Sequence, residues 1–272
     1  MSTDEQTANE VLLEWPREGI ALITLNRPER LNALTYEVVQ GLVTALQQAS
    51  ATPGCRVVVL TGAGRGFCAG MDIAAGVARE AAGPRSVPER YEGQEAFAAM
   101  PRTIRNLRQP VIAAVNGAAA GAGMAITLAA DIRLASPTAA FHIAAVKIGL
   151  SAGECGISYH LPRLIGASRA YEYMLTARPI GAQEAEKLGL VSRLVPGEEL
   201  VAAALDLASE IAVHSPYAIW QTKQVMRANV DNDFETAIAI ENRAQILAVS
   251  TDDSKEAMQA FVQKRSPVYT GR

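Results

Sequence analysis

Two glycine-rich segments contain the residues best suited to chemistry. Residues 62–70 have the sequence Gly-Ala-Gly-Arg-Gly-Phe-Cys-Ala-Gly, and residues 117–123 have the sequence Gly-Ala-Ala-Ala-Gly-Ala-Gly. Each follows an apolar run typical of a buried strand. Because glycine lets the backbone approach a ligand closely, the two loops together can direct backbone N–H groups at one anionic oxygen. Such an oxyanion hole suits a thioester whose carbonyl becomes an enolate, and it requires no side-chain nucleophile.

Nucleotide-binding motifs fit the first loop poorly. A dinucleotide fingerprint starting at Gly62 needs a small residue where this chain has Phe67, and a P-loop needs a Gly-Lys-Ser/Thr sequence that this loop lacks. The remaining alternative for residues 62–70 is a glycine-rich turn whose residues need positive φ angles.

A second candidate chemistry is nucleophilic catalysis by Ser151. Residues 149–153 match the G-x-S-x-G nucleophile elbow, and His214 lies downstream as a candidate base. An elbow passes directly into a helix, whereas the glycines in residues 153–156 disfavour one there. A thioester hydrolase using Ser151 is therefore kept as an alternative. We interpret His142, in an apolar strand-like context, as a packed and hydrogen-bonded histidine.

Composition and charge exclude several classes of protein. The chain has 272 residues, of which 49% are hydrophobic and 19% charged, so it is not a disordered chain. Its formal net charge of −3 argues against nucleic-acid or basic membrane-surface binding. Three cysteines without metal-ligand spacing predict neither a disulfide framework nor a metal site. The polar, acidic start indicates no secretory signal, so we expect a cytoplasmic location.

The elements that would position these loops follow an α/β pattern. A helix is expected after Thr35, a plausible N-cap, and a mobile irregular excursion is expected over residues 76–90. Strands are predicted at residues 11–15, 20–25, 57–60, 111–115 and 132–135, and further helices at 92–107 and from near Pro216, Asp233 and Asp252. This order predicts an α/β domain with a C-terminal helical appendage.

Residues 111–130 could also be taken for a membrane span, because they carry no charge and contain a G-x-x-x-G pattern. The segment is dominated by alanine and glycine, has Asn116 in its middle and follows Pro110. We therefore predict a buried strand, a glycine loop and a buried helix from about Met124, and no membrane association.

Several motifs in the same order and spacing resemble the enoyl-CoA hydratase/isomerase (crotonase) family. They are Leu25-Asn-Arg-Pro-Glu-Arg-Leu-Asn-Ala-Leu34, Gly66-Phe-Cys-Ala-Gly-Met-Asp-Ile73, Pro110-Val-Ile-Ala-Ala-Val-Asn-Gly117, Ala130-Asp-Ile-Arg-Leu-Ala135 and Leu161-Pro-Arg-Leu-Ile-Gly166. The resemblance runs from about residue 10 to the C-terminus. It implies a crotonase-like spiral of ββα repeats, with residues 1–200 forming a core with an acyl-CoA site. Residues 201–272 would form a C-terminal helical region that drives assembly into homotrimers or hexamers.

The resemblance also implies roles for individual residues. The oxyanion hole would be formed by the backbone N–H groups of Met71 and Ala122. Family members often have a basic residue where Glu29 stands, and Arg30 can replace its phosphate contact. An acyl-CoA substrate, with no metal and no further cofactor, would be bound by Glu29, Arg30, Leu31, Ala69, Asp72, Ile73, Phe261 and Lys264. Asp72 and Asp131 are also expected to have structural roles at a loop and a helix end.

The catalytic carboxylates depart from the family pattern. Hydratases of this family place one glutamate just after the second glycine loop and another further along, where this chain has Ala125 and Ala145. One acid remains in the neighbourhood, Glu154, and some relatives, including isomerases, carry a carboxylate in this loop. Apolar surroundings would raise its pKa and suit it to proton transfer. The alternative is that Glu154 caps the helix expected near Gly156.

Three hypotheses follow for the function. The first is an enzyme that stabilises a thioester enolate, with Glu154 moving a proton in double-bond isomerisation or in an atypical hydration of an enoyl-CoA. The second is an acyl-CoA-binding protein that has lost catalysis, which the Ala125 and Ala145 pair favours. The third is the Ser151 hydrolase.

Overall fold

The computed structural model describes residues 10–81, 83 and 85–272. Within them the strands form a six-stranded sheet of order β1-β2-β3-β5-β7-β10 and a four-stranded sheet of order β4-β6-β8-β9. The strands are β1 (Val11–Arg17), β2 (Ile20–Leu25), β3 (Val57–Gly62), β4 (Gly66–Cys68), β5 (Val111–Val115), β6 (Ala118–Ala120), β7 (Ile132–Ala135), β8 (Ala140–His142), β9 (Ile180–Gly181) and β10 (Arg193–Leu194). The predicted α/β class is confirmed.

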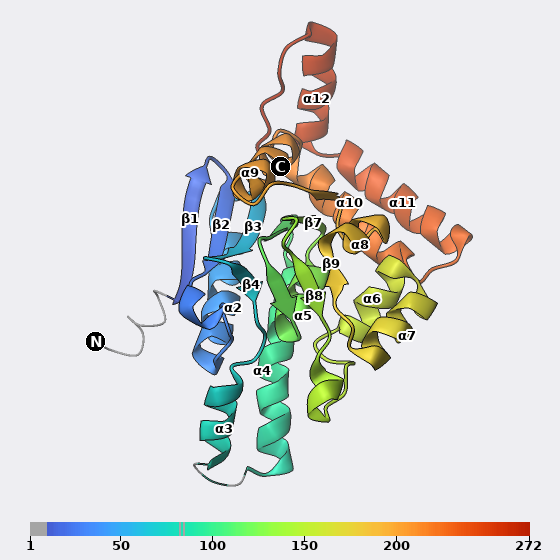
Figure 1. Cartoon of the computed structure of the whole chain (residues 1–272). Helices are drawn as coiled ribbons and strands as arrows, with labels where there is room; N and C mark the ends of the chain where they lie inside the picture. Colours follow the sequence, from blue (N-terminus) through green and yellow to red (C-terminus); the bar gives the residue numbers. More distant parts are fainter. Residues whose placement is uncertain (1–9, 82, 84) are drawn as a thin grey trace.

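Helices separate and cover these strands. They are η1 (Pro28–Arg30), α2 (Tyr36–Ala51), α3 (Ile73–Ala81), α4 (Val87–Asn106), α5 (Ala122–Ala129), η2 (Ala145–Ile148), α6 (Ile157–Ile165), α7 (Ala167–Thr176), α8 (Ala182–Lys187), α9 (Leu200–Ala212), α10 (Pro216–Asn229), α11 (Phe234–Val249) and α12 (Asp252–Gln263). Thr35 caps α2 as predicted, because its hydroxyl accepts a hydrogen bond from Val38 N–H. The predicted C-terminal helices are also present (Figure 1).

The chain alternates between the two sheets, and this alternation places the glycine loops. β3, β5 and β7 lie side by side in the larger sheet, and β4, β6 and β8, which follow them in turn, lie side by side in the smaller sheet. The three strands of each set run parallel to one another. The segments that follow β4 and β6 therefore leave the smaller sheet at the same edge. Parallel pairing therefore brings the two predicted loops together.

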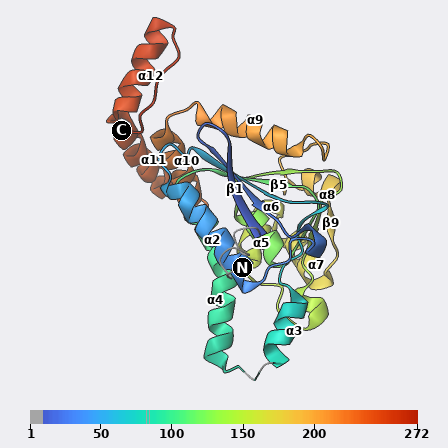
Figure 2. The ribbon, with the colours of Figure 1, turned by 90° about the vertical axis from the view of Figure 1, so that its left-hand side faces the viewer.

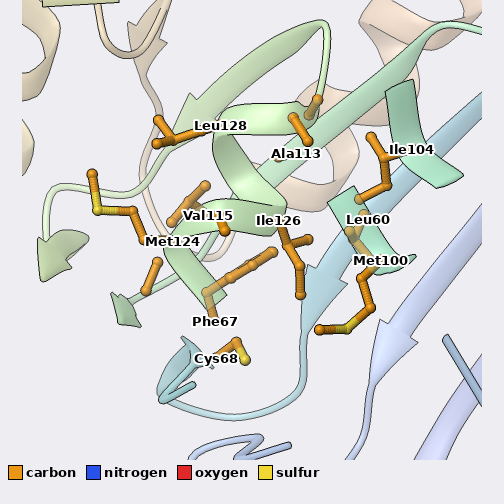
Figure 3. Packing of buried hydrophobic residues seen from close by; sticks show 14 of the residues in the cluster. Leu60, Phe67, Cys68, Met100, Ile104, Ala113, Val115, Met124, Ile126 and Leu128 are labelled. Atoms are coloured by element: carbon orange, nitrogen blue, oxygen red, sulfur yellow. The ribbon is translucent and has the colours of Figure 1, made fainter. Parts of the chain in front are cut away.

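The central strands of the larger sheet are buried on both faces. Every residue of β3 is buried, as its run of apolar residues without alternation predicted. One face packs under α9 (Figure 2), and the other contributes to the main core. In that core Leu60, Phe67, Met100, Val115 and Ile126 meet from β3, β4, α4, β5 and α5 (Figure 3).

Three predictions about local structure were wrong. Residues 76–90 are not an irregular excursion where described: residues 76–81 complete α3, and α4 begins at Val87, five residues before the predicted start. Ser86 caps α4 through a reciprocal pair of hydrogen bonds with Glu89. β1 continues to Arg17, two residues beyond its predicted end, and α5 begins at Ala122 rather than near Met124. Among the described residues, no helix is both long and apolar enough to cross a membrane.

Candidate active site

The two glycine loops touch at Gly70. This residue has a φ angle of 83°, and a Cβ atom added to it would lie 2.6 Å from the carbonyl oxygen of Ala120 and 3.6 Å from the backbone nitrogen of Ala122. Only glycine allows this close approach without displacing one loop. The segment after β4 therefore lies directly against the start of α5.

The backbone N–H of Met71 points away from the neighbouring segment at Leu34. Leu34 and Met71 form an isolated parallel bridge, in which Leu34 N–H donates to the carbonyl of Gly70 (2.7 Å) and Asp72 N–H donates to the carbonyl of Leu34 (2.9 Å). These bonds use the residues on either side of Met71. Its own N–H points away from Leu34, since adjacent peptide groups of an extended segment alternate in direction.

The backbone N–H of Ala122 is at a helix N-terminus. Ala122 is the first residue of α5, and its N-cap, Gly121, makes no side-chain capping bond. The first N–H groups of a helix have no intrahelical partner, and the helix dipole makes this end positive. Gly121 N–H donates to the carbonyl of His142 (3.0 Å), which ties this end to β8. An anionic oxygen is therefore well matched to this position.

The Glu154 carboxylate lies beside this helix start. A Cβ atom added to Gly121 would lie 3.2 Å from Glu154 Oε1. The side chain is half-buried, and burial raises the pKa of its carboxyl group above the ordinary value. Gly156, the N-cap of α6, has no side chain, and the hydrogen bond between Glu154 and this helix uses the backbone: Ile157 N–H donates to the Glu154 carbonyl (2.8 Å). A carboxyl group of raised pKa next to a cluster of backbone donors is suited to moving a proton.

Two asparagines that the sequence analysis did not select hold the first glycine loop. Asn32, buried and with a φ angle of 56°, donates from Nδ2 to the carbonyls of Ala63 (2.9 Å) and Gly66 (2.8 Å). Asn116 donates to the carbonyls of Gly64 (2.8 Å) and Gly66 (3.1 Å). Both lie within motifs shared with the family, but the residue types alone do not distinguish an asparagine that binds the loop from one that binds a ligand.

Comparison with known proteins identifies the family. The model of the family described as Enoyl-CoA hydratase/isomerase matches residues 16–272. This chain belongs to the enoyl-CoA hydratase/isomerase family. It is 44% identical over 267 residues to a "Probable enoyl-CoA hydratase" of Mycobacterium tuberculosis, with 97% of this chain and 94% of the relative covered. It is 36% identical over 264 residues to the 1,2-epoxyphenylacetyl-CoA isomerase of Escherichia coli, with coverages of 97% and 99%.

Solved structures agree with this assignment to the family. A probable enoyl-CoA hydratase/isomerase from Mycobacterium abscessus has a TM-score of 0.87 and 39% identity, with 97% of this chain and 99% of that chain covered. A monofunctional enoyl-CoA isomerase from Mycobacterium smegmatis has a TM-score of 0.71 and 40% identity, with coverages of 85% and 98%. The matched proteins bear hydratase and isomerase names, so the comparisons establish the hydratase/isomerase family without selecting one of the two reactions.

The positions of the usual hydratase glutamates are apolar in this family member. Ala125 is fully buried in α5, and Ala145 is buried at the start of η2. Neither side chain can hold a water molecule or move a proton. Among the described residues, no group of three or more His, Cys, Asp or Glu side chains could hold a metal ion.

Ser151 does not occupy a nucleophile elbow. It follows the 3-10 helix η2 rather than a strand, and α6 begins only at Ile157. Its exposed hydroxyl accepts a hydrogen bond from Gly153 N–H (3.1 Å). His142 is half-buried on β8, and its pKa is lowered mainly by burial and also by the charge of Lys147.

Most residues expected to bind CoA lie near the first glycine loop. Ala69 N–H donates to the carbonyl of Leu31 (2.9 Å), and Ile73 is 58% exposed at the start of α3. Glu29 and Arg30 are exposed in η1.

Asp72, also expected to bind CoA, has structural contacts in the same region. It accepts hydrogen bonds from Ala75 N–H (3.1 Å) and Arg27 (3.4 Å). The Ala75 bond is the main reason that the pKa of Asp72 is lowered, and burial opposes it. These contacts are consistent with the structural role expected for Asp72. Asp131 likewise forms ion pairs, with Lys223 and Arg227.

Phe261 and Lys264 lie elsewhere. Phe261 is 85% exposed on α12, and Lys264 is the C-cap of that helix. In both views α12 projects from the opposite end of the molecule from α3, which begins two residues after Met71 (Figures 1 and 2). Within a single chain, Phe261 and Lys264 therefore do not lie near the glycine loops.

Proposed function

We propose that this protein isomerises the double bond of an enoyl-CoA. The thioester oxygen would accept hydrogen bonds from the N–H groups of Met71 and Ala122, and the Glu154 carboxylate would remove a proton from the α-carbon of a β,γ-unsaturated thioester. The electron pair of the broken C–H bond would pass into the thioester, giving a dienolate with its charge on the held oxygen. Return of the same proton to the γ-carbon would complete the shift of the double bond.

The observation that supports this reaction is the position of Glu154. Its carboxylate adjoins Gly121, one residue before the Ala122 N–H, and its pKa is raised by burial. Isomerisation needs one group that both accepts and returns a proton, whereas the usual hydration by two carboxylates would need acids at Ala125 and Ala145. Hydration remains the second candidate reaction, with Glu154 alone positioning water.

Substitution of Glu154 tests the proposal. Glu154→Gln keeps the shape of the side chain and removes its basicity, so we expect isomerisation of a 3-enoyl-CoA to fall by roughly 10²–10⁴-fold. Formation of the conjugated thioester is followed by its absorbance, and proton exchange in D₂O is followed by mass spectrometry. Glu198→Gln, at an exposed glutamate, is the control. Unchanged isomerisation and exchange in Glu154→Gln would contradict the assigned role.

The same assays distinguish the alternatives. An acyl-CoA-binding protein without catalysis, which the two alanines favour, would bind saturated and unsaturated thioesters without exchange, hydration or isomerisation. A hydrolase would release free CoA, and Ser151→Ala would abolish that release. Hydration would give a 3-hydroxyacyl thioester with solvent oxygen.

We also propose that the family's spiral of ββα repeats and its assembly into trimers apply to this chain. The support lies in the C-terminal helices: α11 has no buried residue, and exposed apolar side chains gather along α10 to α12. They include Met226, Phe234, Ile246, Phe261 and Val262. A second copy would cover them and could bring Phe261 and Lys264 to a neighbouring site. Light scattering of the purified protein measures the assembly, and a monomer at micromolar concentration would contradict it.

A further inference from the structure

A basic groove outside the proposed catalytic site lies where the C-terminal helix α10 meets the core helix α4. Its volume is about 560 Å³, in the range of pockets that take small organic ligands. The lining residues are Arg105, Asn106, Arg108, Trp220, Gln224, Arg227 and Ala228. Three of these seven are arginines and none is acidic, so the lining offers mainly hydrogen-bond donors and positive charge.

The positive charge of this groove is incompletely neutralised. Asp131 is already paired with Lys223 (2.6 Å) and Arg227 (2.9 Å), and Asp231 is paired with Arg163 (2.9 Å). Within the described part of the chain, Arg105 and Arg108 form no ion pair. The charge of Arg105 contributes to lowering the pKa values of both Lys223 and Arg227, although burial contributes more. Like charges held together in this way favour binding of an anion.

Aromatic side chains hold the two unpaired arginines without neutralising them. The Arg108 guanidinium lies 4.7 Å from the ring centroid of Trp220, and that of Arg105 lies 5.2 Å from the ring centroid of Tyr159. Stacking restricts a guanidinium while leaving its N–H groups at the edge available for hydrogen bonds. The arginines are therefore partly ordered for binding an oxyanion.

A smaller cavity continues the groove. It has a volume of about 230 Å³, shares Arg108 and Trp220 with the groove, and is also lined by Arg56 and His214. Arg56 Nη1 is buried and has no hydrogen-bond partner among the described residues. A buried donor without an acceptor is costly, and a bound anion would supply that acceptor.

We propose that the groove and its continuation form a second ligand site, which binds a small organic polyphosphate. The forked guanidinium groups match phosphate oxygens, and the two cavities in series suit an anion with more than one phosphate group. A ligand spanning Arg105 on α4 and Arg227 on α10 would link the core to the C-terminal helices. Its binding would therefore raise the thermal stability of the protein.

Calorimetric titration with tripolyphosphate and with ADP, at physiological salt and with the acyl-CoA site already saturated by butyryl-CoA, tests the site directly. We expect saturable binding of one anion per chain, a rise in Tm, and no binding of adenosine, which lacks phosphate. Binding must persist in the presence of saturating butyryl-CoA, because the proposed site is separate from the thioester site. Absence of saturable binding, or competition by butyryl-CoA, would overturn the proposal.

Variants locate the bound anion. The Arg105→Gln/Arg108→Gln protein should bind tripolyphosphate at least tenfold more weakly, with KM for the thioester unchanged. Arg169→Gln/Arg193→Gln removes the same charge from exposed positions and should bind as the parent does. Equal weakening in both double variants would indicate non-specific attraction and refute the site. If the first double variant fails to fold, Arg108→Lys keeps the charge but loses the fork, and unchanged affinity in it would contradict recognition by the guanidinium.

Discussion

Gly70→Ala should remove the proposed oxyanion hole while preserving every side chain around it. The added methyl group would lie 2.6 Å from the carbonyl oxygen of Ala120, closer than carbon and oxygen atoms can approach, so one of the two loops must move. The φ angle of 83° adds strain of about 1–2 kcal/mol for an L-residue. Displacing one N–H donor of an oxyanion hole costs roughly 10²–10³ in kcat, or about 2.7–4 kcal/mol of transition-state stabilisation.

Gly166→Ala is the control that distinguishes the effect of backbone strain from the effect of moving a glycine loop. Gly166 has a φ angle of 84°, but a methyl group there would meet no atom within 4 Å. Both variants should lose stability from the strain of a positive φ angle, measured by urea unfolding, with a further loss in Gly70→Ala from the contact. Only Gly70→Ala should lose activity in the enoyl-CoA isomerisation assay. If its kcat matches that of Gly166→Ala, the close contact of the two loops does not set the position of the catalytic donors.

Three further outcomes are expected. Because the pKa of Glu154 is raised, kcat/KM should rise with pH through a value above 4.5, and a profile without this acid limb would contradict the assignment. Glu154→Gln removes a half-buried charge and should therefore raise Tm at neutral pH. Burial lowers the pKa of Lys223 from 10.5 to about 8, so the unfolded chain binds more protons between these values. The free energy of unfolding should therefore gain a contribution as pH rises through this window, measured with urea at about pH 7 and about pH 9.5, and Lys223→Met should remove that contribution. Asn32→Ala should lower the free energy of unfolding by about 1–3 kcal/mol and reduce kcat, because it removes the hydrogen bonds that hold the loop. Asn242→Ala, at an exposed position, should do neither. Equal effects of the two substitutions would contradict the role of Asn32 in holding the loop.

Strands and capped helices could be predicted because their signals are local. The β-branched run at Val57–Leu60 indicated a strand buried on both faces, and Thr35 marked the start of α2. α3 could not be predicted in this way, because Gly76 interrupts its sequence and none of its residues is buried. Ion pairs of Glu80 with Arg85 and Arg90 instead link the end of α3 to the start of α4, and side-chain pairs of this kind leave no periodic pattern.

The start of α5 was predicted too late for a tertiary reason. Gly123 disfavours a helix by local propensity, so the prediction began the helix after it. In the structure a Cβ atom at Gly123 would lie 2.3 Å from the carbonyl oxygen of Cys68, so contact between β4 and α5 explains the glycine. The helix consequently begins at Ala122, and that start leaves the Ala122 N–H without an intrahelical partner.

The proposed chemistry depends on where two backbone N–H groups lie. The residues that determine function are therefore those that fix the position of the backbone. A donor N–H is present whatever side chain Met71 or Ala122 carries, so their side-chain types impose little constraint on the oxyanion hole. Its geometry is set instead by Gly70, which allows the loops to touch, and by Asn32 and Asn116, which hold carbonyls of the first loop. Residues that would not contact the substrate thus determine where its charge is stabilised. For the same reason alanine at the usual hydratase positions would leave the proposed hole intact and change only the proton transfers it can support.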